Sequence, residues 1–148
     1  MRNNKGVTLT ELMIVIIVMG IIATLTTMSV TGILETQREK VDKANAEFLG
    51  DAISLAYLDG NIIIQNGRLY NTTTARGYTG TGTWFYDDMG GYIRNRIVPE
   101  ATIAQNRHNA NGGTYRFLFN VDGQEVTVFY YDADRTVINL YTFTLEDY

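Results

Sequence analysis

The feature that most constrains this chain is a long apolar run behind a short basic leader. Residues 1–6 include two basic side chains, and no charged residue lies between Glu11 and Glu35. A helix from Leu12 to Leu34 would reach ~34 Å at a rise of ~1.5 Å per residue, which is enough to cross a hydrocarbon core of ~30 Å. The sequence therefore predicts one hydrophobic helix near the N-terminus, over residues 7–34, that spans the membrane.

The order of leader and apolar run differs from that of a secretory signal peptide. A signal peptide carries its apolar core before the cleavage site and loses that core on processing. Here the only plausible cut, after Gly6, lies on the N-terminal side of the apolar run. The hydrophobic helix is therefore expected to stay in the mature protein.

This junction resembles the class III signal of type IV pilins and pseudopilins. The shared features are a short leader that ends in Gly6, an apolar first mature residue, Val7, and a glutamate at the fifth mature position, Glu11. The resemblance is close at the N-terminus and covers the rest of the chain only in architecture. It implies that a prepilin peptidase cuts between Gly6 and Val7 and that the new N-terminal amine is methylated, here on valine in place of the usual phenylalanine.

Glu11 stands at the edge of the apolar run, where burial of an ionised carboxylate is costly. The cost reaches about 2.5 to 3.5 kcal/mol toward the bilayer centre. The resemblance implies that Glu11 and the amine of Val7 neutralise one another between neighbouring subunits during assembly. The alternative is a carboxylate that reaches the interface of an ordinary membrane anchor.

Gly20 lies in the middle of the predicted span and matches a glycine of the pilin family. The family's proline eight residues later is replaced by Met28, so any unwinding of the helix within a filament would depend on Gly20 and nearby threonines, which are weak helix formers. The alternative is a small residue for close helix packing.

Charge and composition bound the part of the chain beyond the span. Arg2 and Lys5 precede the span, so the positive-inside rule places the N-terminus in the cytoplasm and residues 35–148 outside, as one compact domain. The formal net charge of −4 argues against specific nucleic-acid binding, because phosphate contacts need clustered Lys and Arg. The chain has no cysteine, whereas Gram-negative pilins commonly close a C-terminal loop with a disulfide, and this favours a Gram-positive source.

An amphipathic helix is predicted over residues 35–58, ended by Asp59, Gly60 and Asn61. Charged residues from Glu35 to Asp51 are expected on its solvated face, with subunit-to-subunit charge pairing as the alternative. The expected apolar face consists of Val41, Ala44, Phe48, Ala52, Leu55 and Leu58.

Residues 61–113 are predicted to form a variable loop, because the stretch from Asn71 to Thr83 is rich in threonine and glycine. A short helix is expected from Met89 to Val98, ended by Pro99. The aromatic residues 84–86 are interpreted as a plug that ties the loop to the helix, with an exposed adhesive patch as the alternative.

Residues 114–145 predict an antiparallel β-meander. The strands are expected over Tyr115 to Val121, Glu125 to Tyr131 and Thr136 to Thr144. Alternation pairs Phe117 with Phe119, Val126 with Val128 and Ile138 with Leu140 on faces that would cover the helix. The fold class is therefore α+β, the type IV pilin fold, in which a long N-terminal helix, half transmembrane and half amphipathic, packs on a C-terminal meander.

The residues for enzyme chemistry are not present together. There is no cysteine, and the single histidine, His108, lies in an asparagine-rich stretch. No pair of a nucleophile and a general base can be assigned. No cofactor or metal is expected. The close acidic pairs, Asp87 with Asp88 and Asp132 with Asp134, are typical of turns, although some pseudopilins of this architecture hold calcium in C-terminal loops.

The sequence thus predicts a structural subunit that polymerises with copies of itself. After cleavage it would wait in the cytoplasmic membrane, and an inner-membrane assembly platform and a cytoplasmic assembly ATPase would build it into an extracellular pilus for adhesion, motility or biofilm formation. One alternative is a minor pilin or a pseudopilin of a type II secretion or DNA-uptake system. An alternative of another class is a surface-binding domain on a plain single-span anchor.

Overall fold

The computed structural model describes residues 8–101, 116–132 and 134–146, without the side chains of residues 25–29. The chain divides into two units, residues 1–37 and 38–148. One helix, α1 (Leu9–Leu58), contributes to both units. The predicted cleavage and methylation residues, Gly6 and Val7, lie outside the described residues.

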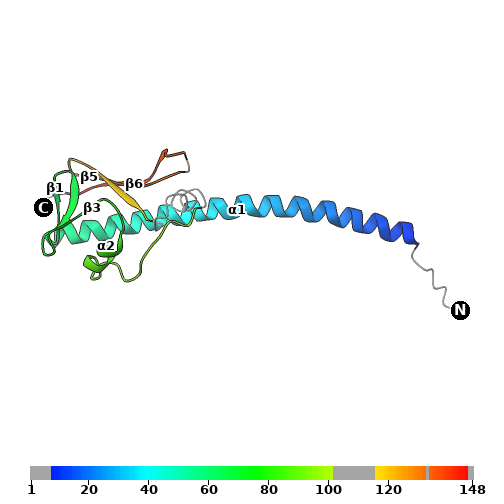
Figure 1. The fold of residues 1–148 in the computed structure, drawn as a ribbon, viewed down its shortest axis with the longest axis horizontal. Helices are drawn as coiled ribbons and strands as arrows, with labels where there is room; N and C mark the ends of the chain where they lie inside the picture. The colour runs from blue at the N-terminus through cyan, green and yellow to red at the C-terminus, as the bar shows by residue number, and fades with distance from the viewer. Residues whose placement is uncertain (1–7, 102–115, 133, 147–148) are drawn as a thin grey trace. The chain divides into compact units, whose positions relative to one another are not determined.

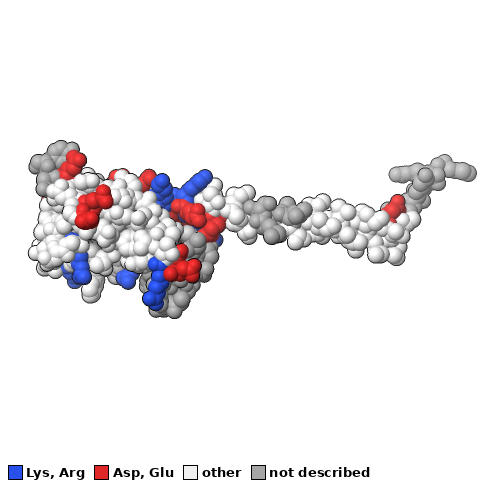
Figure 2. All heavy atoms as spheres, turned by 90° about the horizontal axis from the view of Figure 1, so that it is seen from above, with Lys and Arg blue, Asp and Glu red and all other residues white. Residues whose placement is uncertain are grey.

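The described part of the first unit is helical and exposes its apolar side chains. Exposure of the large hydrophobic residues in this part of α1 runs from 47% for Val18 to 79% for Leu9. No charged side chain interrupts the sequence between Glu11 and Glu35, and Figure 2 shows the described surface there as uniformly uncharged. The described apolar side chains of this part of α1 are therefore open to whatever surrounds the subunit.

α1 ends at Leu58, as the sequence predicts, in a Schellman motif. Gly60 takes a positive φ of 71°, which glycine adopts without strain. The N–H of Gly60 donates to the carbonyl of Tyr57 at 2.9 Å, and the N–H of Asn61 donates to the carbonyl of Ala56 at 2.9 Å. These bonds satisfy the last carbonyls of the helix and turn the chain back toward it.

A three-stranded antiparallel sheet comes after α1, so the predicted loop over residues 61–113 is wrong here. Its strands are β1 (Ile62–Gln65), β2 (Arg68–Asn71) and β3 (Arg76–Tyr78), in that spatial order. Asn66 and Gly67, both at positive φ, form the two-residue turn between β1 and β2. An Asn-Gly pair between apolar runs is a strong hairpin signal, and backbone pairing overrides the loop-like composition of the residues after it.

A short helix, α2 (Thr83–Asp88), lies before the position where the sequence predicts one. The prediction over Met89 to Val98 is wrong, because Gly90 and Gly91 favour turns over a continued helix. α2 buries Phe85 and Tyr86, in agreement with the predicted plug, but leaves Trp84 exposed.

The predicted C-terminal meander is confirmed as a second antiparallel sheet. Its strands are β4 (Leu118–Asp122), β5 (Glu125–Tyr131) and β6 (Val137–Thr144). A bulge where β6 passes Val128 and Phe129 shifts the register, so that Tyr141 stands opposite Val128. The side chains that β6 offers beside the buried valines of β5 are therefore Tyr141 and Phe143, where simple alternation from Ile138 predicts Leu140.

The C-terminal part of α1 packs against these strands with small residues, which corrects the predicted apolar face. Figure 1 shows β5 and β6 alongside this part of the helix. Val41, Phe48 and Leu55 are exposed, because the sheet approaches where the helix carries glycine and alanine. The core positions of α1 are Ala46, Leu49, Ala52, Ile53 and Ala56.

One acidic residue of the charge run is buried, contrary to the predicted solvated face. Asp42 is fully buried. Its carboxylate accepts the backbone N–H groups of Glu100 at 2.6 Å and of Ala101 at 2.9 Å. Buried carboxylates persist when they are hydrogen-bonded, so Asp42 fastens the segment after Pro99 to α1.

Candidate functional site

The predicted assembly residue, Glu11, caps the start of its own helix. Its carboxylate accepts the backbone N–H of Thr8 at 2.8 Å and the hydroxyl of Thr8 at 2.9 Å. In return, the N–H of Glu11 donates to the hydroxyl oxygen of Thr8 at 3.3 Å. This reciprocal pair is a capping box, in which two backbone donors at a helix start find side-chain acceptors.

Thr8 is a site residue that sequence reasoning missed. The signal was present, since a threonine followed three residues later by glutamate and then by an apolar run marks a helix start. The capping box fixes the Glu11 carboxylate beside the backbone of Thr8, the second residue after the predicted cut. The carboxylate is therefore held at the backbone of the residue that follows the predicted mature N-terminus. Gly6 and Val7 themselves lie outside the described residues.

Gly20 lies within α1, which is continuous through it. A Cβ atom there would meet nothing within 4 Å, so the subunit alone does not require glycine at this position. The hydroxyl of Thr24 donates to the carbonyl of Gly20 at 2.6 Å, a backward bond that bends helices slightly and weakens them. Unwinding at Gly20 within a filament stays a prediction.

In the part of the chain that the structure describes, no helix has a stretch that is both long and apolar enough to cross a membrane. The predicted span over Leu12 to Leu34 includes residues 25–29, whose side chains are outside that part. The span therefore also stays a prediction.

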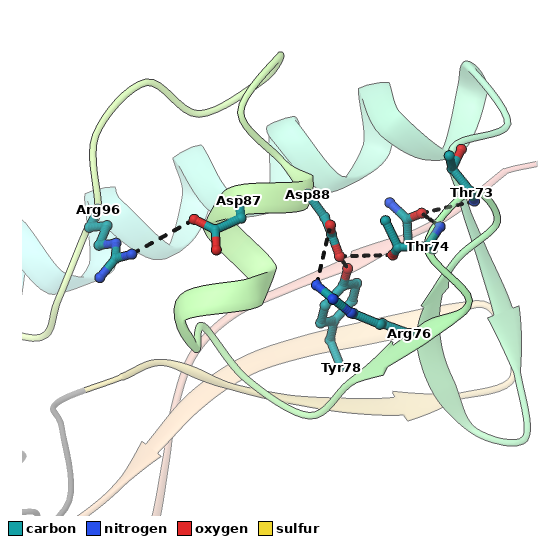
Figure 3. Close-up of polar contacts among 8 residues, drawn as sticks. Thr73, Thr74, Arg76, Tyr78, Asp87, Asp88 and Arg96 are labelled. Atoms are coloured by element: carbon teal, nitrogen blue, oxygen red, sulfur yellow. Dashed lines mark hydrogen bonds and ion pairs between the residues drawn. The ribbon is translucent and has the colours of Figure 1, made fainter.

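The acidic pair Asp87 and Asp88 engages protein groups (Figure 3). Asp88 accepts the hydroxyls of Thr74, at 2.9 Å, and of Tyr78, and it lies 3.8 Å from the guanidinium of Arg76. Burial and the bond to Asp88 raise the pKa of Tyr78 above its ordinary value of 10.0. Asp88 therefore joins the loop after β2 to α2.

Asp87 and Asp132, from the two predicted acidic pairs, also serve local structure. Asp87 pairs with Arg96 at 3.8 Å on the exposed side of α2 (Figure 3). Asp132 accepts the N–H groups of Asp134 at 2.9 Å and of Thr136 at 2.8 Å, as in a turn. Within residues 8–101, 116–132 and 134–146, no group of three or more His, Cys, Asp or Glu is arranged to hold a metal ion.

Comparison with known families matches the N-terminal segment. Residues 1–27 match the prokaryotic N-terminal methylation motif. This motif indicates the type IV pilin and pseudopilin family, and the long helix packed on antiparallel sheets agrees with the architecture expected of that family. Proteins of this family are structural and not enzymes, and the motif implies processing by a prepilin peptidase, a membrane-associated precursor and an extracellular filament. No curated protein and no solved structure matches the chain.

Proposed function

We propose that this chain is the subunit of a type IV pilus, cut between Gly6 and Val7, methylated on Val7 and assembled with copies of itself into a surface filament. The methylation motif over residues 1–27 supports processing and membrane residence. The proposal adds a particular role, that of a filament-forming pilin, to the wider family that this motif indicates.

The observation that carries the proposal is the exposed apolar surface of α1. Its large hydrophobic side chains between Leu12 and Ile22 are about half exposed or more. Soluble proteins rarely leave a continuous apolar surface of this extent uncovered. Lipid covers it in the waiting subunit, and the helices of neighbouring subunits cover it in the filament.

A second exposed stripe supports packing between subunits beyond the membrane segment. Val41, Phe48 and Leu55 recur every seven residues along α1 and are 40%, 48% and 55% exposed. Residues at this spacing lie on one face of a helix. A neighbouring subunit in the filament covers this face, whereas the face with Ala46, Leu49 and Ile53 is covered by the domain's own core.

Glu11 supplies the charge that sets how far each subunit rises before it docks. In the lone subunit, the capping box with Thr8 satisfies the carboxylate. In the filament, the methylated amine of a neighbouring Val7 adds a full positive charge at this carboxylate. Insertion of an unpaired carboxylate among apolar helices is unfavourable, so only the matched register is stable.

Substitution of Gly6 tests the processing step. Gly6→Val should accumulate in the membrane as a precursor heavier by the leader, because a side chain before the cut blocks entry to the peptidase. Gly20→Ala is the matched control, since a Cβ there meets nothing within 4 Å, and it should be cut normally. Normal filaments from Gly6→Val would contradict the proposal.

A minor pilin or pseudopilin role is the second candidate within the same family. A major pilin should dominate the protein sheared from the cell surface, whereas a minor subunit should be a small fraction of it. Retention of Glu11 favours the major role, because tip-initiating subunits of the family often lack this residue.

A further inference from the structure

A pocket of about 510 Å³ opens between the end of β3 and the start of α2. Its walls are residues 77–80, residues 82–85 and Arg116. The bridge between Gly80 and Leu118 fixes this segment against β4, and a Cβ on Gly80 would lie 2.7 Å from the carbonyl oxygen of Phe117. The pocket is thus built from two segments held together by close backbone packing.

Trp84 forms an exposed aromatic wall of this pocket. It is the only tryptophan of the chain and is 64% exposed, although Phe85 and Tyr86 beside it are buried. The guanidinium carbon of Arg76 lies 4.8 Å from the centroid of the Trp84 ring. Arg76 also pairs with Asp88 at 3.8 Å (Figure 3). Arg76, which is itself held by Asp88, therefore supports the indole ring from one side. Because the ring is exposed, this contact adds nothing to the hydrophobic core.

The charge of the pocket is opposite to that of the chain as a whole. The formal net charge is −4, yet Arg116 is the charged residue among those that line the pocket, and none of them is Asp or Glu. Within the described residues, no carboxylate pairs with Arg116. A guanidinium in this position has donors free for a planar anion such as a carboxylate.

The remaining walls supply hydroxyl groups and open space. Thr79 and Thr83 line the pocket with hydroxyl side chains that donate and accept hydrogen bonds. Gly82 also lines the pocket, and the space beside it is open, since a Cβ there would meet nothing within 4 Å. Ligand pockets commonly have volumes of about 300 to 1,000 Å³.

We propose that this pocket binds a sugar that carries a carboxylate. The ring of Trp84 stacks on the apolar face of the sugar, Arg116 binds the carboxylate through paired N–H donors, and the threonines bind ring hydroxyls. A nucleic acid fits less well, because strand binding needs several phosphate contacts and one arginine lines this pocket. The filament would then display an acidic-sugar site on each subunit.

Tryptophan fluorescence gives a direct test, because Trp84 is the sole tryptophan that reports the signal. The full chain, kept in a detergent without a sugar head group, is titrated with digalacturonic acid and with a neutral disaccharide of the same ring size. A saturable change is expected with the acidic sugar alone. Arg116→Ala should weaken its binding at least tenfold, as expected for a lost charge-assisted pair, whereas Arg94→Ala, an exposed arginine outside this pocket, should bind normally.

A ligand-observed NMR measurement tests the stacking residue, since Trp84→Leu removes the fluorescent reporter. Saturation transfer to digalacturonic acid should be lost in Trp84→Leu, while its thermal unfolding stays that of the parent because the side chain is exposed. Equal binding of the neutral disaccharide would overturn the proposal. Binding of a single-stranded oligothymidine in place of the sugar, or no saturable change with the acidic sugar, would overturn it as well.

Discussion

Gly50 of α1 and Tyr141 of β6 lie so close together that a Cβ atom on Gly50 would be 2.6 Å from Cε1 of Tyr141. The ring of Tyr141 stacks on Phe143, with centroids 5.7 Å apart and planes inclined by 18°. Two stacked rings have little freedom to move away from the helix. Glycine at position 50 therefore sets how closely the second sheet approaches α1.

Gly50→Ala should lower the free energy of unfolding by about 1 to 2 kcal/mol. Overpacking typically costs about 1 to 3 kcal/mol, and the better helix propensity of alanine returns up to ~1 kcal/mol. Urea unfolding of residues 35–148 is the measurement, since the core cluster lies between Ala46 and Leu145. Gly91→Ala, at an open position, should change little. If Tyr141→Leu failed to reduce the cost of Gly50→Ala, the contact would not be its source.

Asp42→Ala should destabilise the same domain by about 2 to 4 kcal/mol. The change leaves the N–H groups of Glu100 and Ala101 without their acceptor, and each unsatisfied buried donor costs about 1 to 3 kcal/mol. Asp51→Ala, on an exposed position of α1, is the matched control and should shift the urea midpoint little. Equal midpoints for the two variants would remove the structural role given to Asp42.

Tyr78 should make the domain sensitive to alkaline pH. Its folded pKa is raised by burial and by the bond to Asp88, so the fold favours the neutral phenol. The resulting stability is fully present below the unfolded pKa of about 10 and is lost as the pH rises through the folded pKa. Tyr78→Phe should flatten the fall in the urea midpoint above pH 10, while the ring keeps its edge contact with Phe85. Parallel pH curves for the two proteins would contradict this assignment.

The sequence predicted the long helix and the C-terminal meander because apolar residues recur over each segment at a regular spacing, helical in the first and alternating in the second. The stop at Gly60 and the strands β5 and β6 carry explicit turn and alternation signals. The face of α1 that packs against the sheet was not predictable in the same way. The helix carries two apolar stripes, and the sheet packs on the one with alanines and Gly50, which hydrophobicity alone ranks below Phe48 and Leu55.

The strands β1 to β3 and the role of Thr8 were missed for two reasons. Some of these features have only weak signals in the sequence, and others have a clear signal that was not used. β1 and β2 were readable from Asn66 and Gly67, whereas β3 depends on hydrogen bonding to β2 that its composition does not indicate. At the N-terminus, the motif predicted Glu11 but not the capping role of Thr8. That role was readable from the spacing of the two residues.

Variants of Glu11 and Thr8 separate charge from capping. Glu11→Gln keeps a side-chain oxygen that can accept the Thr8 N–H but removes the charge, so we expect a cleaved, membrane-resident subunit that fails to form filaments without wild-type subunits. Glu11→Ala should fail likewise. Thr8→Ala loses a cap of about 0.5 to 2 kcal/mol and should give fewer filaments, whereas Thr8→Ser keeps the hydroxyl and should assemble normally. Electron microscopy and immunoblots of sheared fractions report the outcome.

Wild-type yields from Glu11→Gln would mean that capping, and not charge, is what assembly requires. Wild-type yields from Glu11→Ala would exclude both roles and leave Glu11 as an interfacial carboxylate with no part in assembly.

The central claim is that this chain is processed into a filament subunit, and the N-terminus of the surface protein tests it most directly. Filaments are sheared from cells that express the wild-type chain, and the N-terminal peptide is identified by mass spectrometry. We predict that the peptide begins at Val7 and carries a methyl group on its amine. Recovery of the chain only in the membrane fraction, with Met1 or the intact leader still attached, would contradict the account.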